Sequence, residues 1–275
     1  MNALTFTLKK TLQHSINCAA LTPNNLANKS ITEIAVILLG YGKSQLRVDE
    51  VFEITGETSN ACAQNICFKN TSNKLDYLGA HMTSGRIRIE GDAGAYLGYN
   101  LKQGEIHCQG STQAFAACNM AGGLLEIDGD TGEFLGGASA GLRKGMRGGT
   151  VIVKGNAGDR VGDQMRRGLI LIEGNVGDYC GSRMIAGTIG VLGDVGEYAG
   201  FNMKHGTLIF SKIPKLHATI QDCGTHTLPF LHLMFKSFAQ FETKFANMQT
   251  QRVQRFVGDA ACNGNGEILL LTPLQ

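Results

Sequence analysis

One stretch of the sequence repeats itself every 19 residues. Seven units begin at residues 76, 95, 114, 133, 159, 178 and 197, and only the fourth is longer, by seven residues. A period near 20 residues is typical of proteins in which one small structural unit stacks on the next. Because a single unit cannot bury its own apolar side chains, neighbouring units must share one continuous core.

Each unit contains one short strand with alternating apolar side chains. In the first unit this strand is the segment 86–90, in which Ile87 and Ile89 point to the same face. Both positions recur in every unit, which predicts two ladders inside a parallel β-solenoid. The ladders comprise Ile87, Ile106, Leu125, Val151, Ile170, Ile189 and Leu208, and Ile89, Cys108, Ile127, Val153, Ile172, Val191 and Phe210.

Glycines flank each strand at the points where the chain must turn. Two further ladders strengthen the prediction of a solenoid. One ladder is aromatic and is interrupted once by Arg160; the other consists of methionine and one leucine. They comprise Tyr77, Tyr96, Phe115, Phe134, Tyr179 and Tyr198, and Met82, Leu101, Met120, Met146, Met165, Met184 and Met203. We therefore predict an all-β dominated fold of about seven 19-residue coils with mixed α/β caps at both ends.

The coils divide the chain into three parts: an N-terminal cap over 1–75, the coils over 76–215 and a C-terminal cap over 216–275. In the N-terminal cap, Ala3–Leu8 alternates like a strand. Ser30 and Glu33 form a capping box, which predicts a helix that ends at Leu38 or Leu39. The segments 46–48 and 51–55 resemble strands, and 66–68 begins an irregular coil.

The C-terminal cap contains an amphipathic segment over 228–246, which predicts a helix with one broad phenylalanine-rich face. Strands are expected over 252–257 and 267–271. In the last four coils the outward strand positions become apolar, as an outer strip of Ile152, Leu171, Gly190 and Ile209. Water should not contact this strip. Either the chain's own C-terminal helix or a separate protein of the same assembly is expected to cover it.

Composition excludes several classes of function. The net charge is +2 at pH 7, which favours neither nucleic acid nor an acidic membrane as a partner. No apolar run approaches 18 residues and the first ten lack a signal-peptide core, so we expect a cytoplasmic protein without membrane contact. The eight cysteines form no CxxC pair.

Basic residues gather near the insertion in the fourth coil, over 137–143, and at one repeat position of other coils. One interpretation is a solvated edge whose charges oppose aggregation. The other is a contact for an anionic ligand or an acidic protein partner. The candidate residues are Lys102, Arg143, Lys144, Arg147, Arg166, Arg167 and Lys204.

Motifs for catalysis or metal binding are sparse. Cys223 and His226 have a plausible ligand spacing but are weak candidates, so no metal site is predicted. The segment 40–44 resembles part of a phosphate-binding loop but lacks its first glycine, so a simple helix-to-strand turn is the favoured interpretation. The sequence contains no HExxH and no iron–sulfur spacing, and no catalytic residue is assigned.

The glycine pattern resembles the GXGXG β-helix domain shared by two groups of proteins. One is the C-terminal domain of the glutamate synthase large subunit. The other comprises the C subunits of formylmethanofuran dehydrogenase and of the bacterial formyltransferase/hydrolase complex. The segments GDAGAYLGYNLKQGEI and GNVGDYCGSRMIAGTIGVLGDVGEYAGFNMKHGTLI carry the resemblance, and LTPNNLANKSITEIAVILLGYG and the final GEILLLTP favour the second group.

This resemblance implies a right-handed parallel β-helix in a cytoplasmic multi-subunit enzyme of one-carbon metabolism. The complex handles a formyl group on methanofuran or methylofuran and passes it to a tetrahydromethanopterin-type carrier or hydrolyses it. The resemblance implies no catalytic residue or cofactor in this chain, whose partners are the other subunits. In a dehydrogenase, the metal pterin and the iron–sulfur clusters belong to those subunits. The carriers have glutamate tails that could meet the basic residues.

Three functional hypotheses follow. The first is a non-catalytic scaffold subunit of the formyltransferase/hydrolase complex, with a molybdenum or tungsten formylmethanofuran dehydrogenase, an oxidoreductase, as the alternative complex. The second is an independent enzyme such as a β-helix acyltransferase, although those use 18-residue coils rather than the 19 found here. The third is a stand-alone structural module similar to the glutamate synthase domain.

Overall fold

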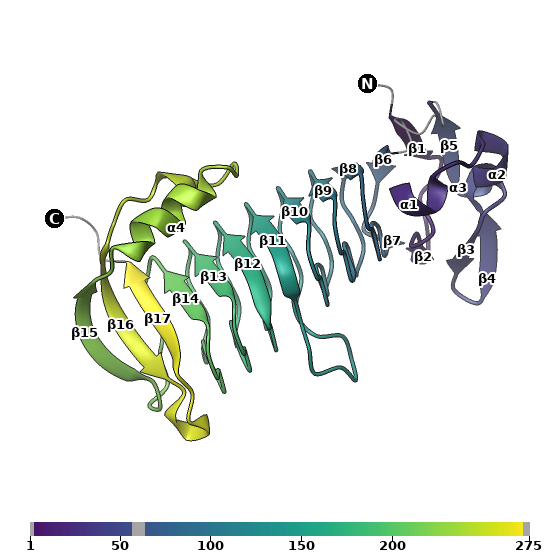
Figure 1. The fold of residues 1–275 in the computed structure, drawn as a ribbon. Coiled ribbons are helices and arrows are strands. Elements are labelled where there is room, and N and C mark those ends of the chain that lie inside the picture. The colour runs from purple at the N-terminus through teal and green to yellow at the C-terminus, as the bar shows by residue number, and fades with distance from the viewer. Residues whose placement is uncertain (1–2, 57–63, 272–275) are drawn as a thin grey trace.

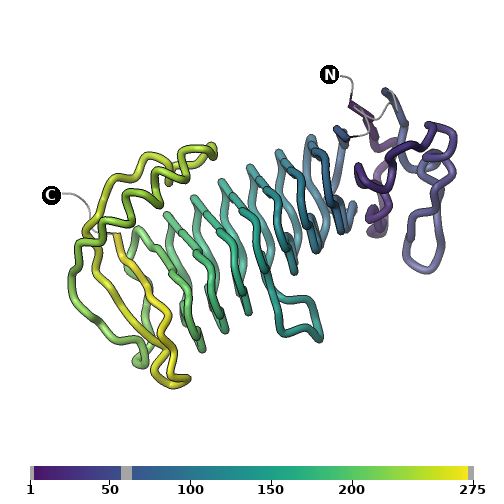
Figure 2. Tube along the Cα trace, in the orientation of Figure 1, coloured from purple at the N-terminus to yellow at the C-terminus, as the bar shows by residue number. Residues whose placement is uncertain are grey.

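A computed structural model describes residues 3–56 and 64–271 of the chain. Within these residues, thirteen strands form one sheet, and most neighbouring strands are parallel. Each coil contributes one strand to this sheet, and the coils stack along the molecule (Figures 1 and 2). The coil strands are β6 (Asn65–Thr71), β8 (Arg86–Gly91), β9 (Glu105–Cys108), β10 (Leu124–Ile127), β11 (Arg147–Val153), β12 (Arg167–Ile172), β13 (Thr188–Val191) and β14 (Thr207–Phe210).

The two predicted apolar ladders are confirmed. Successive members are register partners, as in the pairs of Ile87 with Ile106 and Ile170 with Ile189. Every residue of both ladders is 1% exposed or less, and the methionine ladder is equally buried. Because the strand alternates with a period of two, the same register brings both ladders into one continuous core.

The aromatic ladder is also confirmed, and its backbone is unusual. Neighbouring rings stack with centroids 4.6–5.0 Å apart. Arg160 continues the stack, with its guanidinium 4.6 Å from the Tyr179 ring centroid and 5.8 Å from that of Phe134. Tyr96 has a φ of 61°, and the other members resemble it. This left-handed conformation costs roughly 1–2 kcal/mol. Ring stacking, worth about 0.5–1.5 kcal/mol, offsets this cost. So do hydrogen bonds from the backbone N–H groups to the next coil, such as that from Tyr96 to the carbonyl oxygen of Ala114.

Glycines permit the tight spacing of the coils at their corners. A side chain at Gly193 would place its Cβ 2.3 Å from the carbonyl oxygen of Gly174 in the previous coil. No other residue type fits there without moving one coil away from the next. The high glycine content therefore follows from the repeat.

The N-terminal part combines sheet strands with short helices. The capping box of Ser30 and Glu33 is present, but its helix ends at Ala35 rather than at Leu38 or Leu39, because Leu38 begins a strand. Gly42 lies in the turn of a β-hairpin, so the segment 40–44 is neither a phosphate loop nor a helix-to-strand turn. The elements are β1 (Leu4–Leu8), β2 (Ile16–Asn17), α1 (Pro23–Leu26), α2 (Ile31–Ala35), β3 (Leu38–Tyr41), β4 (Ser44–Arg47), α3 (Val48–Val51), β5 (Phe52–Thr55) and β7 (Leu75–Asp76).

The C-terminal part extends the same sheet. Strand β17 (Gly266–Leu271) pairs in parallel with β14, and β16 (Arg252–Gly258) and β15 (Gln221–Thr227) follow in antiparallel order. The predicted helix over 228–246 is wrong in extent. Helix α4 covers only Phe230–Phe238, and a 3-10 turn, η1 (Lys244–Asn247), follows after a bend; a second, η2 (Ala260–Cys262), precedes β17.

The chain's own C-terminal part covers the apolar outer strip. Leu171 and Ile209 are fully buried and form a second core with residues of α4 and η1, including Phe235 and Phe245. A Cβ at Gly190 would lie 2.7 Å from a Phe245 ring carbon, so the ring packs directly on the strand. Figure 1 shows α4 lying alongside the later coils. The strip is therefore internal and is not a free surface for a partner.

Candidate functional site

The seven candidate cations share one property, and we call them the basic edge. Among the described residues, none of them forms an ion pair with a carboxylate. Other cations of the coils do so, for example Lys154 with Asp128 at 2.8 Å and Arg183 with Asp163 at 2.5 Å. The remaining paired cations are Arg86, Arg88, Lys212 and Lys215. Unneutralised charge is therefore concentrated at one edge of the coils.

Hydrogen bonds hold part of the basic edge in place. Arg147 donates from Nη2 to Asn100 Oδ1 at 3.0 Å, although 47 residues separate the two. Arg166 donates from Nη2 to the carbonyl oxygen of Arg143 at 3.4 Å, while its buried Nε lacks a partner in the described part of the chain. Lys204 donates to the carbonyl of Cys262 at 3.0 Å. Lys102, Arg143, Lys144 and Arg167 remain exposed.

A pocket of about 670 Å³ lies beside the insertion of the fourth coil. Phe115 and Phe134 of the aromatic ladder form one side, and Gln164 and Arg183 contribute polar groups. The insertion closes it with Ala138, Ser139, Ala140, Gly141, Leu142 and Arg143, and Asp163 completes the lining.

An ion pair between a buried carboxylate and a partly exposed arginine supports this pocket. The Asp163 side chain is 2% exposed and accepts from Arg183 Nε at 2.9 Å and Nη2 at 2.5 Å. Ser182 donates its hydroxyl to the same carboxylate at 2.6 Å. Burying a carboxylate is costly unless its charge and lone pairs are satisfied, and these three bonds satisfy it. The guanidinium of Arg183 is thereby fixed in orientation.

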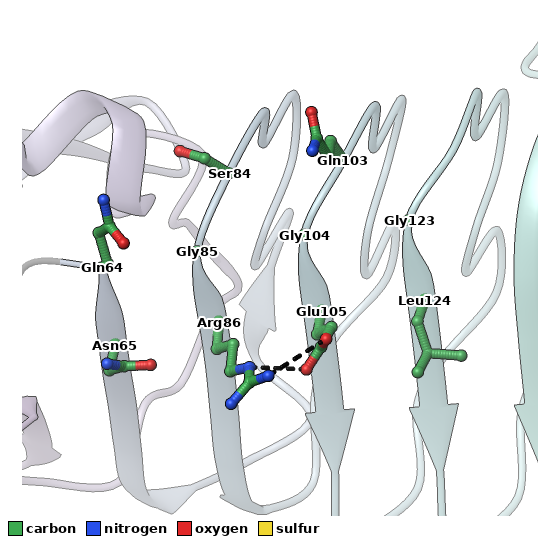
Figure 3. A pocket seen from close by; sticks show the side chains of 10 residues that line it. All are labelled: Gln64, Asn65, Ser84, Gly85, Arg86, Gln103, Gly104, Glu105, Gly123 and Leu124. Atoms are coloured by element: carbon green, nitrogen blue, oxygen red, sulfur yellow. Dashed lines mark hydrogen bonds and ion pairs between the residues drawn. The ribbon is translucent and has the colours of Figure 1, made fainter. Parts of the chain in front are cut away.

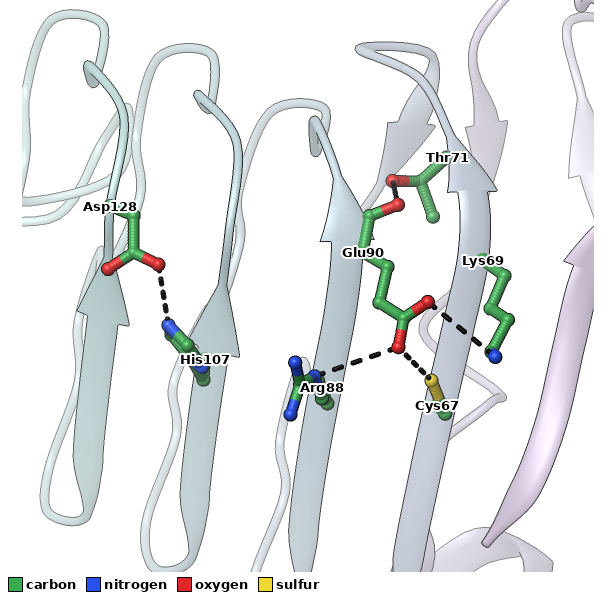
Figure 4. Close-up of polar contacts among 7 residues, drawn as sticks. All are labelled: Cys67, Lys69, Thr71, Arg88, Glu90, His107 and Asp128. Carbon is green, nitrogen blue, oxygen red and sulfur yellow. Dashed lines mark hydrogen bonds and ion pairs between the residues drawn. The ribbon is translucent and has the colours of Figure 1, made fainter.

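The first coils present a polar outer face that no helix of the described residues covers. On it, Glu90 lies 3.7 Å from Arg88 Nε, 3.6 Å from Lys69 Nζ and 3.7 Å from the Cys67 sulfur (Figure 4). His107 Nε2 lies 2.9 Å from Asp128 Oδ2. Because most of these charges are neutralised within the chain, the face carries little net charge.

A shallow pocket of about 570 Å³ borders this face where the strands begin. Figure 3 shows Arg86 and Glu105 bridging adjacent strands across it. The Arg86 Nε to Glu105 Oε2 distance is 2.7 Å. The remaining lining is mainly glycine and short polar side chains, so it offers few groups that could hold a ligand.

Two carboxylates of the polar face have shifted pKa values. Partial burial raises the pKa of Glu126, against the opposing effect of His107 and Lys154. Partial burial also acts on Asp128, but hydrogen bonds from Lys154 and His107 outweigh it and hold the pKa of that carboxyl below its usual range. The ionised form of Glu126 therefore weakens folding, whereas that of Asp128 supports it.

Replacing Glu126 by glutamine is expected to raise the Tm at pH 7. The folded-state pKa of Glu126 is raised, so ionisation costs stability once the pH exceeds the unfolded pKa of about 4.3. The gain should shrink as the pH falls through that value and vanish below it, because the wild-type carboxyl is then protonated in both states. Thermal unfolding of both proteins between pH 4 and pH 8 checks this. Glu105→Gln, on the exposed Arg86 pair, serves as control, and a lower Tm for Glu126→Gln at pH 7 would contradict the prediction.

The weak metal-ligand candidates near the C-terminus are Cys223 and His226. Cys223 is exposed on β15, and His226 Nε2 contacts the carbonyl oxygen of Cys223 at 2.9 Å rather than its sulfur. In residues 3–56 and 64–271 no group of three potential metal ligands comes together. Within the same residues, no helix has the length and apolar character needed to span a bilayer.

Sequence reasoning missed the pocket and the buried pair that supports it. Asp163 and Arg183 are 20 residues apart and meet only because the coils stack. A signal was present, since Asp163 occupies a repeat position that is uncharged in every other coil, as Ala80, Tyr99, Cys118, Gly137, Ser182 and Phe201.

Known proteins resemble this chain over part or all of its length. No protein-family model matches. The C subunit of the molybdenum-containing formylmethanofuran dehydrogenase 1 of Methanosarcina barkeri is 34% identical over 87 residues, covering 31% of this chain and 29% of the relative. The C subunit of the Methylorubrum extorquens formyltransferase/hydrolase complex Fhc is 35% identical over 90 residues, covering 33% and 32%. The chain thus matches about a third of the length of these curated relatives.

A solved structure matches almost the whole chain. It is a chain in the crystal structure of the formyltransferase/hydrolase complex (FhcABCD) from Methylorubrum extorquens in complex with methylofuran. The TM-score is 0.89 at 35% identity, covering 98% of this chain and 100% of that one. An agreement of this extent, together with the named relatives, shows that the chain belongs to the family formed by the C subunits of formylmethanofuran dehydrogenases and of the formyltransferase/hydrolase complex.

Proposed function

We propose that this chain is the scaffold subunit of a complex that transfers and hydrolyses formyl groups carried on a furan-type cofactor such as methylofuran. The observation that carries the proposal is the match over 98% of the chain, at 35% identity, to a chain of a formyltransferase/hydrolase complex in complex with methylofuran. In this proposal a tetrahydromethanopterin-type carrier exchanges the formyl group at the level of the complex. The chemistry belongs to the partner subunits.

We further propose that residues 76–215 form a right-handed parallel β-helix of the GXGXG type, capped by 1–75 and 216–275. Continuous parallel pairing from β6 to β14 supports it, with register shifts only at Lys69/Thr71 and at Arg147/Thr150. Parallel bridges at a second position, from Thr112 through Thr131 and Ala157 to Val176 and Val195, support a coil that pairs on more than one side. Such a rod is rigid because each coil packs on two neighbours.

The basic edge is the proposed contact of this protein with an anionic group. Its unpaired charges support either an acidic partner surface or the carboxylates of a carrier. Since α4 and η1 cover the apolar outer strip, a partner does not bind the strip itself. Charged and exposed side chains then define the docking surface.

A formylmethanofuran dehydrogenase is the second candidate complex. Partial matches to the C subunits of molybdenum and tungsten enzymes favour it, including a Methanococcus maripaludis tungsten enzyme that is 31% identical over 94 residues. The match over the whole chain favours the transferase and hydrolase instead.

Purification of the native protein from its own cells distinguishes these proposals. We expect stoichiometric partners that include a formyltransferase and an amidohydrolase-like protein, with no molybdenum or tungsten by elemental analysis. Partners containing pterin-bound metal and iron–sulfur clusters would establish the dehydrogenase instead. A chain without stoichiometric partners would overturn the scaffold function.

A further inference from the structure

Three departures from the repeat meet at one place in the coils. The insertion lies between Gly136 and Met146, Arg160 interrupts the aromatic ladder in the following coil, and Asp163 introduces a buried charge. Insertions in a repeat protein commonly build its binding face. The insertion and Asp163 line the 670 Å³ pocket, and Arg160 lies over the ring of Phe134, another lining residue. This coincidence points to a selected feature rather than a tolerated loop.

The insertion projects from the coils before β11, away from the rod (Figure 1). Near its tip, Leu142 is 53% exposed, and Arg143 and Lys144 follow it without an ion-pair partner in the described residues. An exposed leucine beside two unneutralised cations leaves apolar surface in water and positive charge unscreened. Arginine and large apolar side chains are also the residues that concentrate binding energy at protein interfaces.

The pocket behind the loop is already ordered. Phe115 and Phe134 stack with centroids 4.9 Å apart and offer an apolar wall. Arg183 also lines the pocket and is held by Asp163, yet its side chain remains 44% exposed. A guanidinium has five N–H donors, and Asp163 occupies only two of its nitrogen atoms, so Arg183 retains donors for an entering acceptor. Fixed groups of this kind lose little entropy on binding.

We propose that the loop 137–144 and this pocket, here the insertion dock, bind an acidic segment of a partner protein in the complex. Carboxylates of that segment pair with Arg143 and Lys144, and an apolar or aromatic side chain enters the pocket against Phe115 and Phe134. The inference rests on the proposed function for the existence of a partner. A symmetric contact with a second copy of this chain does not fit, because it would bring the same positive charges together.

Carbodiimide coupling of the native complex tests the occupant directly. This reagent joins an amine to a carboxylate only where the two are in contact. We expect peptide mapping to find Lys144 linked to an Asp or Glu of a different protein of the complex. Two results would refute an acidic partner segment as the occupant. One is a link from Lys144 to a second copy of this chain, and the other is no link to any partner while other lysines couple.

Charge reversal tests whether the insertion dock matters for assembly. The double variant Arg143→Glu/Lys144→Glu changes exposed side chains only, so its Tm should equal that of the wild type. We expect at least about tenfold weaker binding to the partner subunits, with a weaker dependence on salt. The matched control is Lys10→Glu/Lys43→Glu, which reverses two exposed cations of the N-terminal part.

Unchanged affinity and salt dependence in the Arg143→Glu/Lys144→Glu complex would refute the insertion dock while leaving the scaffold function intact. If the wild-type chain itself has no partners, the proposed function fails first. A loss of binding in both double variants would indicate general electrostatics and would also refute a specific dock.

Discussion

Replacing Ile170 by aspartate is expected to lower the free energy of unfolding by about 4–5 kcal/mol or more. Ile170 is fully buried in the inner ladder, between Val151 and Ile189 of the adjacent coils. An aspartate there has neither water nor a cation to satisfy its charge. Since domains of this kind are stable by only about 5–15 kcal/mol, the variant should lose a large part of its stability. Thermal or urea unfolding measures the loss.

Ile170→Val is the matched control for that substitution. It keeps the apolar character and should cost about 0.5–1.5 kcal/mol. A variant with aspartate that cannot be recovered folded, beside a well-behaved valine variant, agrees with the prediction. An unchanged unfolding transition for Ile170→Asp would show that this position does not face the core.

Replacing Phe245 by alanine should have the next largest effect, about 3–5 kcal/mol of stability. Phe245 is fully buried, packs on the backbone of Gly190 and meets Phe238 edge-on at 6.3 Å between ring centroids. Its removal leaves a cavity and loosens the cover of the outer strip. We expect increased binding of a hydrophobic dye in addition to a lower Tm.

An exposed phenylalanine of the same segment provides the comparison. Phe230 is 46% exposed at the start of α4, and Phe230→Ala should change stability by no more than about 0.5 kcal/mol. Equal effects of the two substitutions would mean that Phe245 does not seal the strip. A loss of partner binding by Phe245→Ala at full stability would instead place a partner on this surface.

Periodicity explains why so much of the fold was predictable. Once Ile87 and Ile106 are assigned to equivalent positions, the register of all later coils follows, including Val151 after the insertion. The covering of Leu171 and Ile209 also followed from chemistry, since an apolar strip requires an apolar cover and the phenylalanine-rich segment offered one.

The wrong or missing predictions concern segments outside the repeat. The apolar pattern continues past Phe238 to Phe245, but the chain bends between them and resumes as a 3-10 turn, because packing on Gly190 rather than helical spacing positions Phe245. Strand β17 lacks the repeat motif, so its parallel pairing with β14 was not foreseen.

The pocket and its buried ion pair escaped prediction for a different reason. The contact of Asp163 with Arg183 depends on side-chain direction at two left-handed corners, since Gln164 and Arg183 both have positive φ. Residue spacing alone does not give that direction. The basic edge, in contrast, could be proposed from spacing because several of its members share a repeat position.

The stacked sheet also makes the length of the molecule a discrete quantity. Each coil adds one strand spacing of about 4.8 Å, and antiparallel strands close the sheet at both ends, where β5 pairs with β1 and β15 with β16. Adding or deleting one 19-residue unit would therefore shift everything held at one end by a single fixed step and rotate it slightly, without disturbing either terminus. The distance between the two ends of such a chain is therefore set by the number of its coils.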